Sequence, residues 1–494
     1  MVDLASARVL VVGLGVTGRA VVRALASRAG SVVSLDARAA DADVADAGEV
    51  DLGAVDLVVA SPGWPPTTPV LVEALARSIP VWSEVELAWH LRVACPSTGE
   101  PAPWLAVTGT NGKTTTVEML QSILEADGHR TVAVGNVGRP LVDAVLDETL
   151  DVLAIELSSF QLHFTHSMSV LAGAVLNVAQ DHLDWHGSLE DYARAKGRIY
   201  ERAQRACIYN TADARTEQLV RDADVREGAR AVGLTLGAPG RSELGVVDGV
   251  LCDRAFHAAD DDPTRHERAA ELGTLDDLAH LAGPDGSVPS HVVSNALAAA
   301  ALARAYGVGA SAVRDGLRAF QPGGHRIETV ATAPARHRTT DDGIAAPGAD
   351  EPPAVAFVAF ESSTNAHAAA ASLGSFAPGT VVWIAGGLAK GATFDELVRS
   401  RAGQLRAAVL IGTEHAGLRE ALERHAPDVP VVEVDPGDTG TVMHRAVDHA
   451  FDLAQPGDTV LLAPACASMD QFSSYAERGD AFTAEARRIA SATR

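Results

Sequence analysis

Short apolar runs recur along the chain, and each is followed by glycine, proline or polar residues and then by a stretch with helical periodicity. Apolar runs that end in this way are typical of buried parallel strands, each followed by a helix. The pattern therefore predicts an α/β protein built mostly of parallel sheets with helices on their faces. We find no internal repeat with a period of about 20 to 50 residues.

The predicted elements fall into three blocks. The first, 1–95, ends in the proline-rich linker 95–103, and the third begins after the glycine-rich stretch near 321. We expect a Rossmann-like N-terminal domain at 1–95, a central domain at 96–321 and a Rossmann-like C-terminal domain at 322–494. The segment 243–289 is predicted to be less regular, and 332–353 to be an insertion. The predicted strands are 8–12, 32–35, 57–60, 104–108, 131–134, 152–155, 172–176, 206–209, 381–385, 408–411, 429–434 and 459–463.

Length, charge and cysteine usage narrow the class of protein. At 494 residues the chain exceeds the size of a single core, and its formal net charge of -24 disfavours nucleic acid and anionic membranes as partners. The four cysteines are far apart and form no CxxC pair, which predicts neither a zinc site nor disulfides. The N-terminus lacks the features of a secretion signal, and no long uncharged apolar run predicts a membrane span. We expect a cytoplasmic protein.

A first glycine loop follows the first predicted strand. Gly13, Gly15 and Gly18 have the GxGxxG spacing, and Asp36 ends the next strand. Backbone at such a turn can approach a pyrophosphate, and the following helix N-terminus favours negative charge. The motif alone suggests a nicotinamide dehydrogenase, or simply glycines that permit a tight turn. It does not identify the nucleotide.

A second loop, at 107–116, carries more information. It has the sequence VTGTNGKTTT between a predicted strand and a predicted helix, so the central domain is predicted to be of the P-loop ATPase type. Lys113 supplies a charge for phosphates, and Thr114 offers a hydroxyl to Mg²⁺. The usual P-loop has glycine where this chain has Val107, so the loop is a shorter variant that begins at Gly109. The alternative is a glycine- and threonine-rich turn with a solvated lysine.

Candidate metal and acid–base residues follow other predicted strands. Glu156 ends one strand, and the cluster 181–187 (DHLDWHG) follows another. Carboxylates at strand ends suit Mg²⁺, which phosphoryl transfer requires. Glu156 could also be a simple capping carboxylate. Lys196 lies on a predicted helix and by itself would be interpreted as a solvated surface lysine.

Taken together, these residues resemble the Mur ligases, the amide-forming ligases of peptidoglycan synthesis, over nearly the whole chain. The match is strongest to members that join D-glutamate to UDP-N-acetylmuramoyl-L-alanine. The matching motifs are GLGVTG at 13–18, ASPG at 60–63, TGTNGKTTT at 108–116, GNVG at 135–138, IELSSFQL at 155–162, DHLDWHG at 181–187, YARAKGRIY at 192–200, SNALAAA at 294–300, GGHRIE at 323–328 and APACASMDQF at 463–472.

The resemblance implies a reaction and its ligands. ATP with Mg²⁺ would phosphorylate the substrate carboxylate, and the amine of D-glutamate would attack the acyl phosphate. It also implies that Lys196 is carbamylated by CO₂, which turns a cation into an anionic oxygen ligand suited to Mg²⁺. We expect a monomer with no nucleic-acid partner and no membrane span.

The resemblance also assigns residues to each ligand. The implied catalytic residues are Lys113, Glu156, His182 and Lys196, and the implied metal ligands are Thr114, Glu156, His182 and Lys196. The implied ATP contacts are Gly109, Thr110, Asn111, Gly112, Lys113, Thr114, Thr115, Asn295 and Arg326, with His325 beside them. The implied substrate contacts are Leu14, Val16, Thr17, Asp36, Arg38, Ser61, Gly63, Asn136 and His182, with Thr364, Lys390, Ser468, Met469 and Tyr475 around D-glutamate. Ser468 is also predicted to lie near a helix N-terminus, where backbone amides suit a carboxylate.

One segment departs from the family pattern. Members usually carry Asp-Asp-Ser-Lys-Ala-Thr-Asn before a helix of the third domain, whereas this chain has AFESSTN at 359–365. The Asp that typically meets ATP and the Lys beside it align with Phe360 and Ser362. Three alternatives therefore stay open: another Mur or folylpolyglutamate-type ligase, a catalytically weak nucleotide-binding homologue, and a dehydrogenase. A ligase that adds a diamino acid would carry an Asp-Asn-Pro-Arg pattern, which the chain lacks.

Overall fold

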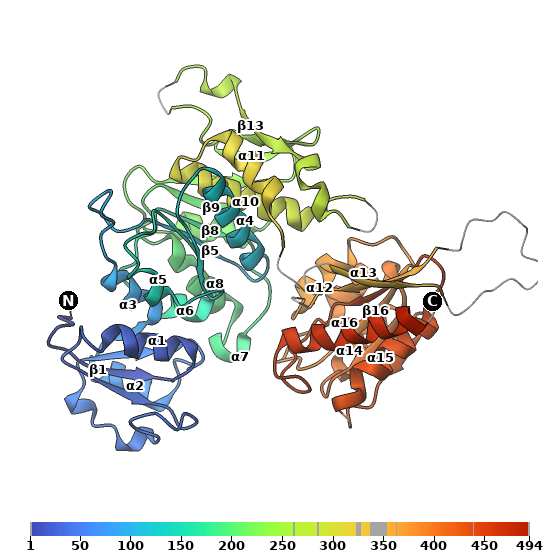
Figure 1. The fold of residues 1–494 in the computed structure, drawn as a ribbon, viewed down its shortest axis with the longest axis horizontal. Coiled ribbons are helices and arrows are strands. Elements are labelled where there is room, and N and C mark those ends of the chain that lie inside the picture. The colour runs from blue at the N-terminus through green and yellow to red at the C-terminus, as the bar shows by residue number, and fades with distance from the viewer. Residues whose placement is uncertain are drawn as a thin grey trace, which may run out of the picture. The chain divides into compact units, whose positions relative to one another are not determined.

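The computed structural model places the described residues in three sheets and two compact units (Figure 1). Unit 1 comprises 1–179, 185–280 and 290–320, and unit 2 comprises 180–184, 281–289 and 321–494. The prediction of an α/β fold with mostly parallel sheets is confirmed. The residues described are 2–259, 262–283, 286–322, 328–335, 353–361, 363–437 and 439–492.

The first sheet of unit 1 is fully parallel, with the order β2-β1-β3-β4. Its central strands are buried along nearly their whole length, as expected of strands covered by helices on both faces. Its strands are β1 Arg8–Val12, β2 Ser31–Leu35, β3 Leu57–Ala60 and β4 Val81–Ser83, and its helices are α1 Val16–Leu25, α2 Pro69–Ala76 and α3 Glu84–Leu91.

The second sheet of unit 1 has the order β13-β12-β11-β10-β9-β8-β5-β7-β6. Strands from β6 to β11 run parallel, so that the ends of β5 and β7 meet at one edge. The strands are β5 Trp104–Thr108, β6 Ala133–Gly135, β7 Leu153–Glu156, β8 Ala172–Val175, β9 Ala206–Asn210, β10 Arg230–Leu234, β11 Glu243–Val247, β12 Val250–Asp253 and β13 Ala270–Thr274. The helices are α4 Lys113–Ala126, α5 Leu141–Ala144, α6 Ser159–His163, α7 Leu183–His186, α8 Leu189–Gly197, α9 Ala214–Asp222, α10 Ser290–Tyr306 and α11 Ala310–Ala319.

The segment 243–289 is more regular than the sequence analysis predicts. It contributes β11, which pairs parallel with β10, and then β12 and β13, which extend the second sheet by antiparallel pairing. Asp248 and Gly249 join β11 to β12, and both have positive φ angles of 50° and 80°. An Asp-Gly pair between apolar residues is a strong signal for a two-residue hairpin turn, and this signal could have identified the hairpin.

The third sheet lies in unit 2, with the order β14-β15-β19-β16-β17-β18. All neighbouring pairs are parallel except β14 with β15. The strands are β14 Glu328–Ala333, β15 Val355–Ala359, β16 Val381–Gly386, β17 Leu405–Ile411, β18 Val431–Glu433 and β19 Thr459–Leu462. The helices are α12 Ala366–Leu373, α13 Asp395–Arg401, α14 Ala416–His425, α15 Thr439–Leu453 and α16 Tyr475–Ala492. Most of the insertion predicted at 332–353 lies outside the described residues.

Direct hydrogen bonds connect the first two sheets of unit 1. The Glu84 carboxylate at the start of α3 accepts the Leu141 amide of α5 at 2.8 Å, and the Glu86 carboxylate accepts the His166 and Ser167 amides at 2.8 and 2.9 Å. One hydrophobic cluster also continues from the first sheet into the second. These contacts explain why both sheets belong to one compact unit.

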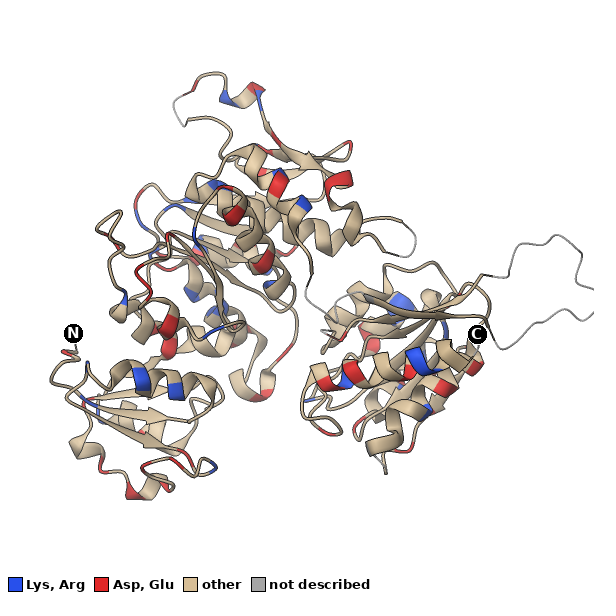
Figure 2. Ribbon diagram, viewed as in Figure 1, with Lys and Arg blue, Asp and Glu red and all other residues tan. Residues whose placement is uncertain are grey.

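Acidic residues are distributed over both units (Figure 2), in keeping with the net charge of -24. In the part of the chain that the structure describes, no helix combines the length and apolar character that crossing a bilayer requires.

Candidate active site

The phosphate loop connects the end of β5 to the start of α4. Gly112 precedes the helix with φ +84°, a left-handed conformation that favours glycine. The Lys113 ammonium folds back over the loop and donates to the carbonyl oxygens of Gly109 and Thr110, each at 3.0 Å. Lys113 and the helix N-terminus therefore bring positive charge to the same loop, as a phosphate site requires. Thr114 and Thr115 follow in the first turn of α4 and are partly exposed.

Asn177, just after β8, holds the loop by three hydrogen bonds. Its side-chain oxygen accepts the Asn111 amide at 2.9 Å, its side-chain amide donates to the Asn111 carbonyl at 3.1 Å, and its carbonyl accepts the Thr110 amide at 3.0 Å. The sequence analysis does not identify this residue, because a lone asparagine after a strand carries no motif signal.

The Thr110 side chain makes further contacts that hold the loop. Its hydroxyl accepts the Ala179 amide at 2.9 Å and lies 3.2 Å from the Tyr192 hydroxyl. Tyr192 in turn packs edge-on against His186, whose ring stacks on Phe160. Tyr192, His186 and Phe160 come from three separate sequence motifs, and they form one chain of contacts that ends at the phosphate loop.

Glu156 ends β7 beside the phosphate loop, as predicted. It is 1% exposed, its Oε1 accepts the Asn136 side-chain amide at 2.8 Å, and its Oε2 is buried without a hydrogen-bond partner among the described residues. A Cβ at Gly135 would lie 2.2 Å from the Glu156 carbonyl oxygen, and Gly135 has φ +105°, so glycine is required there. The GNVG motif therefore places Asn136 directly against Glu156.

Lys196 is buried, and the interpretation of a solvated surface lysine is wrong. Its side chain on α8 is 1% exposed, and its Nζ donates to the Gly109 carbonyl at 2.7 Å. The same Nζ lies 4.4 Å from the centre of the Tyr192 ring. The sequence pattern alone could not show this, because α8 turns its Lys196 face toward the phosphate loop only in the folded unit.

Asn295 of α10 approaches the phosphate loop from another direction. It is 7% exposed, and a Cβ added to Gly112 would lie 2.4 Å from its Oδ1. The structure therefore brings together Gly109, Gly112, Lys113, Lys196 and Asn295 within unit 1. Arg326 and His325, the other residues expected near ATP, lie outside the described residues.

The first glycine loop forms a tight turn that other side chains hold. A Cβ at Gly18 would lie 1.8 Å from the Gly13 carbonyl oxygen, and the Ser61 hydroxyl donates to that same oxygen at 2.9 Å. The Asp36 carboxylate accepts the Leu14 and Arg38 amides at 2.8 Å each, and these bonds lower its pKa.

The open side of this loop presents the other expected substrate contacts. No atom outside the loop lies within 4 Å of a Cβ at Gly15, and Val16 is 76% exposed at the start of α1. Thr17 is partly exposed, Arg38 is exposed, and Leu14 is buried. The loop backbone and the first turn of α1 are therefore accessible from solvent.

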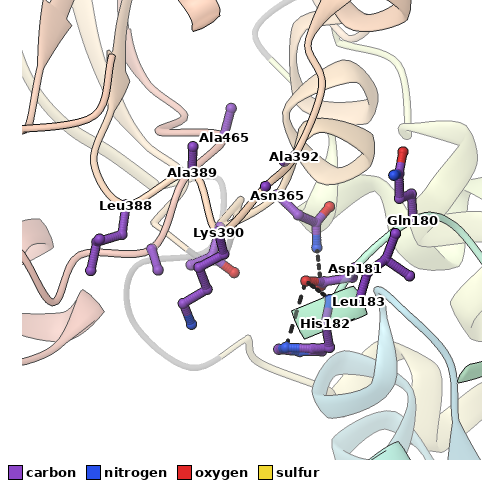
Figure 3. Close-up of a pocket in the computed structure, with 13 residues that line it drawn as sticks. Gln180, Asp181, His182, Leu183, Asn365, Leu388, Ala389, Lys390, Ala392 and Ala465 are labelled. Carbon is purple, nitrogen blue, oxygen red and sulfur yellow. Dashed lines mark hydrogen bonds and ion pairs between the residues drawn. The ribbon is translucent and has the colours of Figure 1, made fainter. Parts of the chain in front are cut away.

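A pocket in unit 2 contains three of the expected site residues, His182, Thr364 and Lys390. In Figure 3 the Asn365 amide points at the Asp181 carboxylate, which it meets at 3.1 Å, and Lys390 extends from the loop after β16. His182 has φ +53°, and its backbone amide donates to Asp181 at 2.9 Å. The lining residues are Gln180, Asp181, His182, Leu183, Thr364, Asn365, Leu388, Ala389, Lys390, Gly391, Ala392, Ala465 and Ala467.

The remaining residues expected around D-glutamate follow Ala467, the last lining residue of this pocket, in the sequence. Ser468 is buried, whereas Met469 and Tyr475 are 66% and 53% exposed. The expectation of a helix N-terminus at Ser468 is wrong, because α16 begins only at Tyr475 and Ser468 lies in the turn region after β19.

The departing segment 359–365 is built into the core rather than left open. The Phe360 amide donates to the Leu462 carbonyl at 2.9 Å, and its side chain packs against the apolar cluster of α12, β16 and β17. Glu361 is fully buried. Phe360 offers neither charge nor hydrogen-bonding side chain to a nucleotide, and Ser362 lies outside the described residues.

Comparison with known proteins shows which family the chain belongs to. A UDP-N-acetylmuramoylalanine–D-glutamate ligase from Streptomyces coelicolor is 56% identical over 434 residues, which cover 88% of this chain and 84% of that protein. The chain belongs to this ligase family. A second member, from Thermobifida fusca, is 47% identical over 505 residues and covers 99% of this chain and all of that protein. The model of the Mur ligase middle domain matches residues 107–303.

A likeness to solved structures agrees at the level of the fold. A pseudomurein peptide ligase type C from Methanothermus fervidus superposes with a TM-score of 0.57 at 17% identity, over 99% of this chain and all of that one. Membership of this ligase family excludes the dehydrogenase interpretation of the first glycine loop.

Proposed function

We propose that the chain is an ATP-dependent ligase that joins D-glutamate to UDP-N-acetylmuramoyl-L-alanine during the synthesis of peptidoglycan precursors. The observation that carries this proposal is the identity of 44% or more to ligases of that name over most of the chain. The geometry of the phosphate loop supports it, because Lys113, Glu156 and Lys196 belong to one unit and the two lysines contact the same carbonyl.

ATP binds at the phosphate loop in this proposal. Lys113 exchanges its two carbonyl partners for the β- and γ-phosphates, and the amides at the start of α4 face the same negative charge. Asn177 and Thr110 keep the loop in position, so little backbone ordering remains to be done on binding. Asn295 and Arg326 are the proposed further ATP contacts.

The reaction proceeds in two steps. A carboxylate oxygen of the alanyl group attacks the γ-phosphorus of ATP, the bond to the β-phosphate oxygen breaks, and ADP leaves with an acyl phosphate formed. The neutral amine of D-glutamate then attacks the acyl carbon, forming a tetrahedral intermediate that expels phosphate and loses a proton from nitrogen. The chain's own contribution is to position the reactants and to stabilise the charge on the transferred phosphoryl group.

The residues beside the loop fit a Mg²⁺ ion. The Thr114 hydroxyl and the Glu156 carboxylate are hard oxygen donors, and the buried Oε2 of Glu156 has no hydrogen-bond partner in the part of the chain that the structure describes. Such an orphaned buried oxygen is costly unless a cation or a donor satisfies it. Among the described residues no group of three or more His, Cys, Asp or Glu side chains forms a metal site, which suits an ion that takes its other ligands from phosphate and water. When bound, Mg²⁺ neutralises phosphate charge.

We further propose that Lys196 carries a carbamate. Reaction of its neutral amine with CO₂ forms an N–C bond and releases one proton, and it replaces a buried cation by an anionic oxygen donor. The burial of Lys196 and its 2.7 Å contact to the Gly109 carbonyl support a position next to the phosphates. His182 is proposed to assist a second Mg²⁺.

The two substrates are assigned to separate regions. We propose that Leu14, Val16, Thr17, Asp36, Arg38, Ser61 and Gly63 hold the UDP group and that Asn136 contacts the sugar-linked substrate. Thr364, Lys390, Ser468, Met469 and Tyr475 are proposed to hold D-glutamate. The support is that Val16 and Arg38 are exposed at the open side of the first loop, and that Thr364 and Lys390 line the pocket of unit 2.

A substrate-dependence assay tests the function. Phosphate release from ATP should require UDP-N-acetylmuramoyl-L-alanine and D-glutamate together, and a peptide-bonded product should form in equal amount. L-Glutamate and UDP-N-acetylmuramate without alanine are the matched controls, and Lys113→Ala checks that release comes from this loop. Release that proceeds equally without D-glutamate would contradict the proposal and would favour a weak nucleotide-hydrolysing homologue.

Location and oligomeric state complete the proposal. ATP and the UDP-linked precursor are cytoplasmic compounds, so we propose that the chain works in the cytoplasm, and that it does so as a monomer. Light scattering of the purified chain with and without substrates tests the second point, and a mass of two or more chains would contradict it.

A further inference from the structure

Three loops at one edge of the third sheet line the pocket of unit 2. They follow β15, β19 and β16, which are adjacent parallel strands, so their carboxyl ends lie side by side. The loop after β15 supplies Thr364 and Asn365, the loop after β16 supplies 388–392, and the loop after β19 supplies Ala465 and Ala467. The shape of the pocket depends on how these three loops are held together.

A buried ion pair contacts all three loops. Arg478, in the first turns of α16, places its Nε 3.0 and 3.1 Å from the two carboxylate oxygens of Glu361 in the first loop. The Arg478 Nη1 donates to the Gly386 carbonyl at 3.4 Å, and its Nη2 donates to the Cys466 carbonyl at 3.2 Å. Arg478 is 1% exposed and Glu361 is fully buried.

Backbone hydrogen bonds also connect the loops to one another. The Ala465 amide donates to the Ser363 carbonyl at 2.8 Å, and Leu388 and Ala467 exchange two backbone hydrogen bonds of 2.9 and 3.1 Å. Gly387 passes closely over the guanidinium, because a Cβ there would lie 3.2 Å from the Arg478 Nη1. The backbone bonds align the loops, and Arg478 bonds to a residue at the end of each of the three strands.

We propose that Glu361 and Arg478 form a positioning pair that sets the affinity of the unit 2 pocket for its amino-acid substrate. This inference rests on the proposed function for the identity of that substrate, D-glutamate. Neither residue lines the pocket, so the pair acts through Thr364, Lys390 and the backbone between 386 and 392. A planar guanidinium with several fixed donors suits this task better than the single point charge of a lysine.

A positioning role for this pair can be distinguished from a role that only stabilises the folded unit. Replacing both partners by apolar residues of similar volume is often neutral for stability, whereas removing one partner leaves an uncompensated buried charge. A pair that served only to stabilise unit 2 could therefore be replaced without effect on substrate binding. A positioning pair could not, because apolar residues donate nothing to the Gly386 and Cys466 carbonyls.

The test uses the full chain with the double substitution Glu361→Leu/Arg478→Met and the single substitution Arg478→Lys. The KM for D-glutamate should rise by at least about tenfold in the double variant, while the KM for ATP changes less than about threefold and the melting temperature stays close to that of the parent. The same variant should show at least about tenfold faster hydrogen exchange at the Leu388, Ala465 and Ala467 amides. Arg478→Lys should give an intermediate KM for D-glutamate.

Asp458→Asn is the matched control. Asp458 is 2% exposed and pairs with Arg406 in the same unit, but it lies at the amino end of β19, away from the pocket. This variant should lower the melting temperature without raising the KM for D-glutamate or speeding exchange at the three loop amides. A folded double variant with parental KM for D-glutamate and parental exchange would overturn the proposal. If the double variant fails to fold, an Arg478→Lys variant with a parental KM and parental exchange would overturn it equally.

Failure of the proposed function gives a different result. In that case the parent chain itself would show no D-glutamate dependence, while the exchange measurement would still decide whether the pair holds the loops.

Discussion

At the scale of single residues, Lys196 shows how strongly burial changes the meaning of a side chain. By sequence it resembles any charged residue on an amphipathic helix, and neighbouring Arg194 is one, with a side chain that is 72% exposed. In the structure Lys196 instead reaches the Gly109 carbonyl of the phosphate loop. This burial is what the proposed carbamate role of Lys196 requires, and the exposed Arg194 on the same helix lacks it.

The carbamate proposal makes Lys196→Ala the sharpest single substitution. We expect ligase activity to fall by roughly 10–100-fold, the usual loss when a group that organises a metal site is removed. Added acetate or propionate should restore part of it by supplying the missing carboxylate oxygen. Arg194→Ala is the control and should retain parental activity. Full activity of Lys196→Ala, measured by phosphate release, would exclude the carbamate role.

At the scale of secondary-structure elements, the start of α4 depends on glycine for two distinct reasons. Gly112 has φ +84°, and a Cβ there would lie 2.4 Å from the Asn295 Oδ1. Gly128, just past the other end of α4, has φ +86° with no atom near its Cβ. Alanine at either position forces a left-handed backbone, which costs about 1–2 kcal/mol. Only alanine at 112 also collides with α10.

These two glycines form a matched pair of variants. We expect Gly112→Ala to raise the KM for ATP by at least about tenfold, because the phosphate loop must move away from Asn295. Gly128→Ala should lower the free energy of unfolding by about 1 kcal/mol and leave the KM for ATP unchanged. Equal effects on KM from both variants would mean that backbone strain, and not the contact with Asn295, determines ATP binding.

The junction of α3 with α5 contains an unusual carboxyl group. Glu84 is 1% exposed, and burial raises its pKa to about 7, although the Val142 and Leu141 amides act in the opposite direction. Because the pKa is higher in the folded state, the protonated form contributes stability that is fully present below about pH 4.5. That stability is lost as the pH rises toward 7, and a shift of this size corresponds to about 3 kcal/mol.

We therefore expect Glu84→Gln to remove a pH dependence from unit 1. Urea unfolding between pH 5 and 8 should show the parent losing stability relative to the variant, by up to about 3 kcal/mol at the upper end. Glu86→Gln is the control. Its carboxyl is buried too, but bonds to His90, Ser167 and His166 outweigh burial and lower its pKa to about 2. Its effect should be constant over the same range, and a flat difference for Glu84→Gln would contradict the assignment.

The sequence predicts the parallel strands well and the long-range polar contacts poorly. The predicted bounds of β1, β3 and β5 match the structure, since a buried parallel strand is marked by its own apolar run. The hairpin β11–β12 is not among the predicted elements, although Asp248-Gly249 marks its turn. Glu361 and Arg478 could not be paired from sequence, because they are 117 positions apart and neither belongs to a local pattern. The sequence identifies the motif residues of the phosphate loop, but it does not identify Asn177, which holds that loop by three hydrogen bonds.

At the scale of the whole molecule, each unit has its own hydrophobic core. The apolar clusters of the first two sheets lie in unit 1, and those of the third sheet lie in unit 2. The phosphate loop belongs to unit 1. Phe360, which stands where the family pattern has an ATP-contacting Asp, offers ATP no charge from unit 2. Most of the proposed ATP contacts belong to unit 1, so ATP should stabilise unit 1 more than unit 2.

Thermal unfolding tests whether ATP stabilises the two units to different extents. Five of the six tryptophans lie in unit 1, and Trp383 is the sixth, so fluorescence reports mainly on unit 1 while circular dichroism reports on both units. With Mg²⁺ and ATP at about 100 times Kd, the fluorescence transition should gain about 2.7 kcal/mol, whereas a second component seen by circular dichroism should gain clearly less. Lys113→Ala should abolish the gain. A single transition that moves as a whole with both probes would instead show that the units unfold together and share the binding energy of ATP.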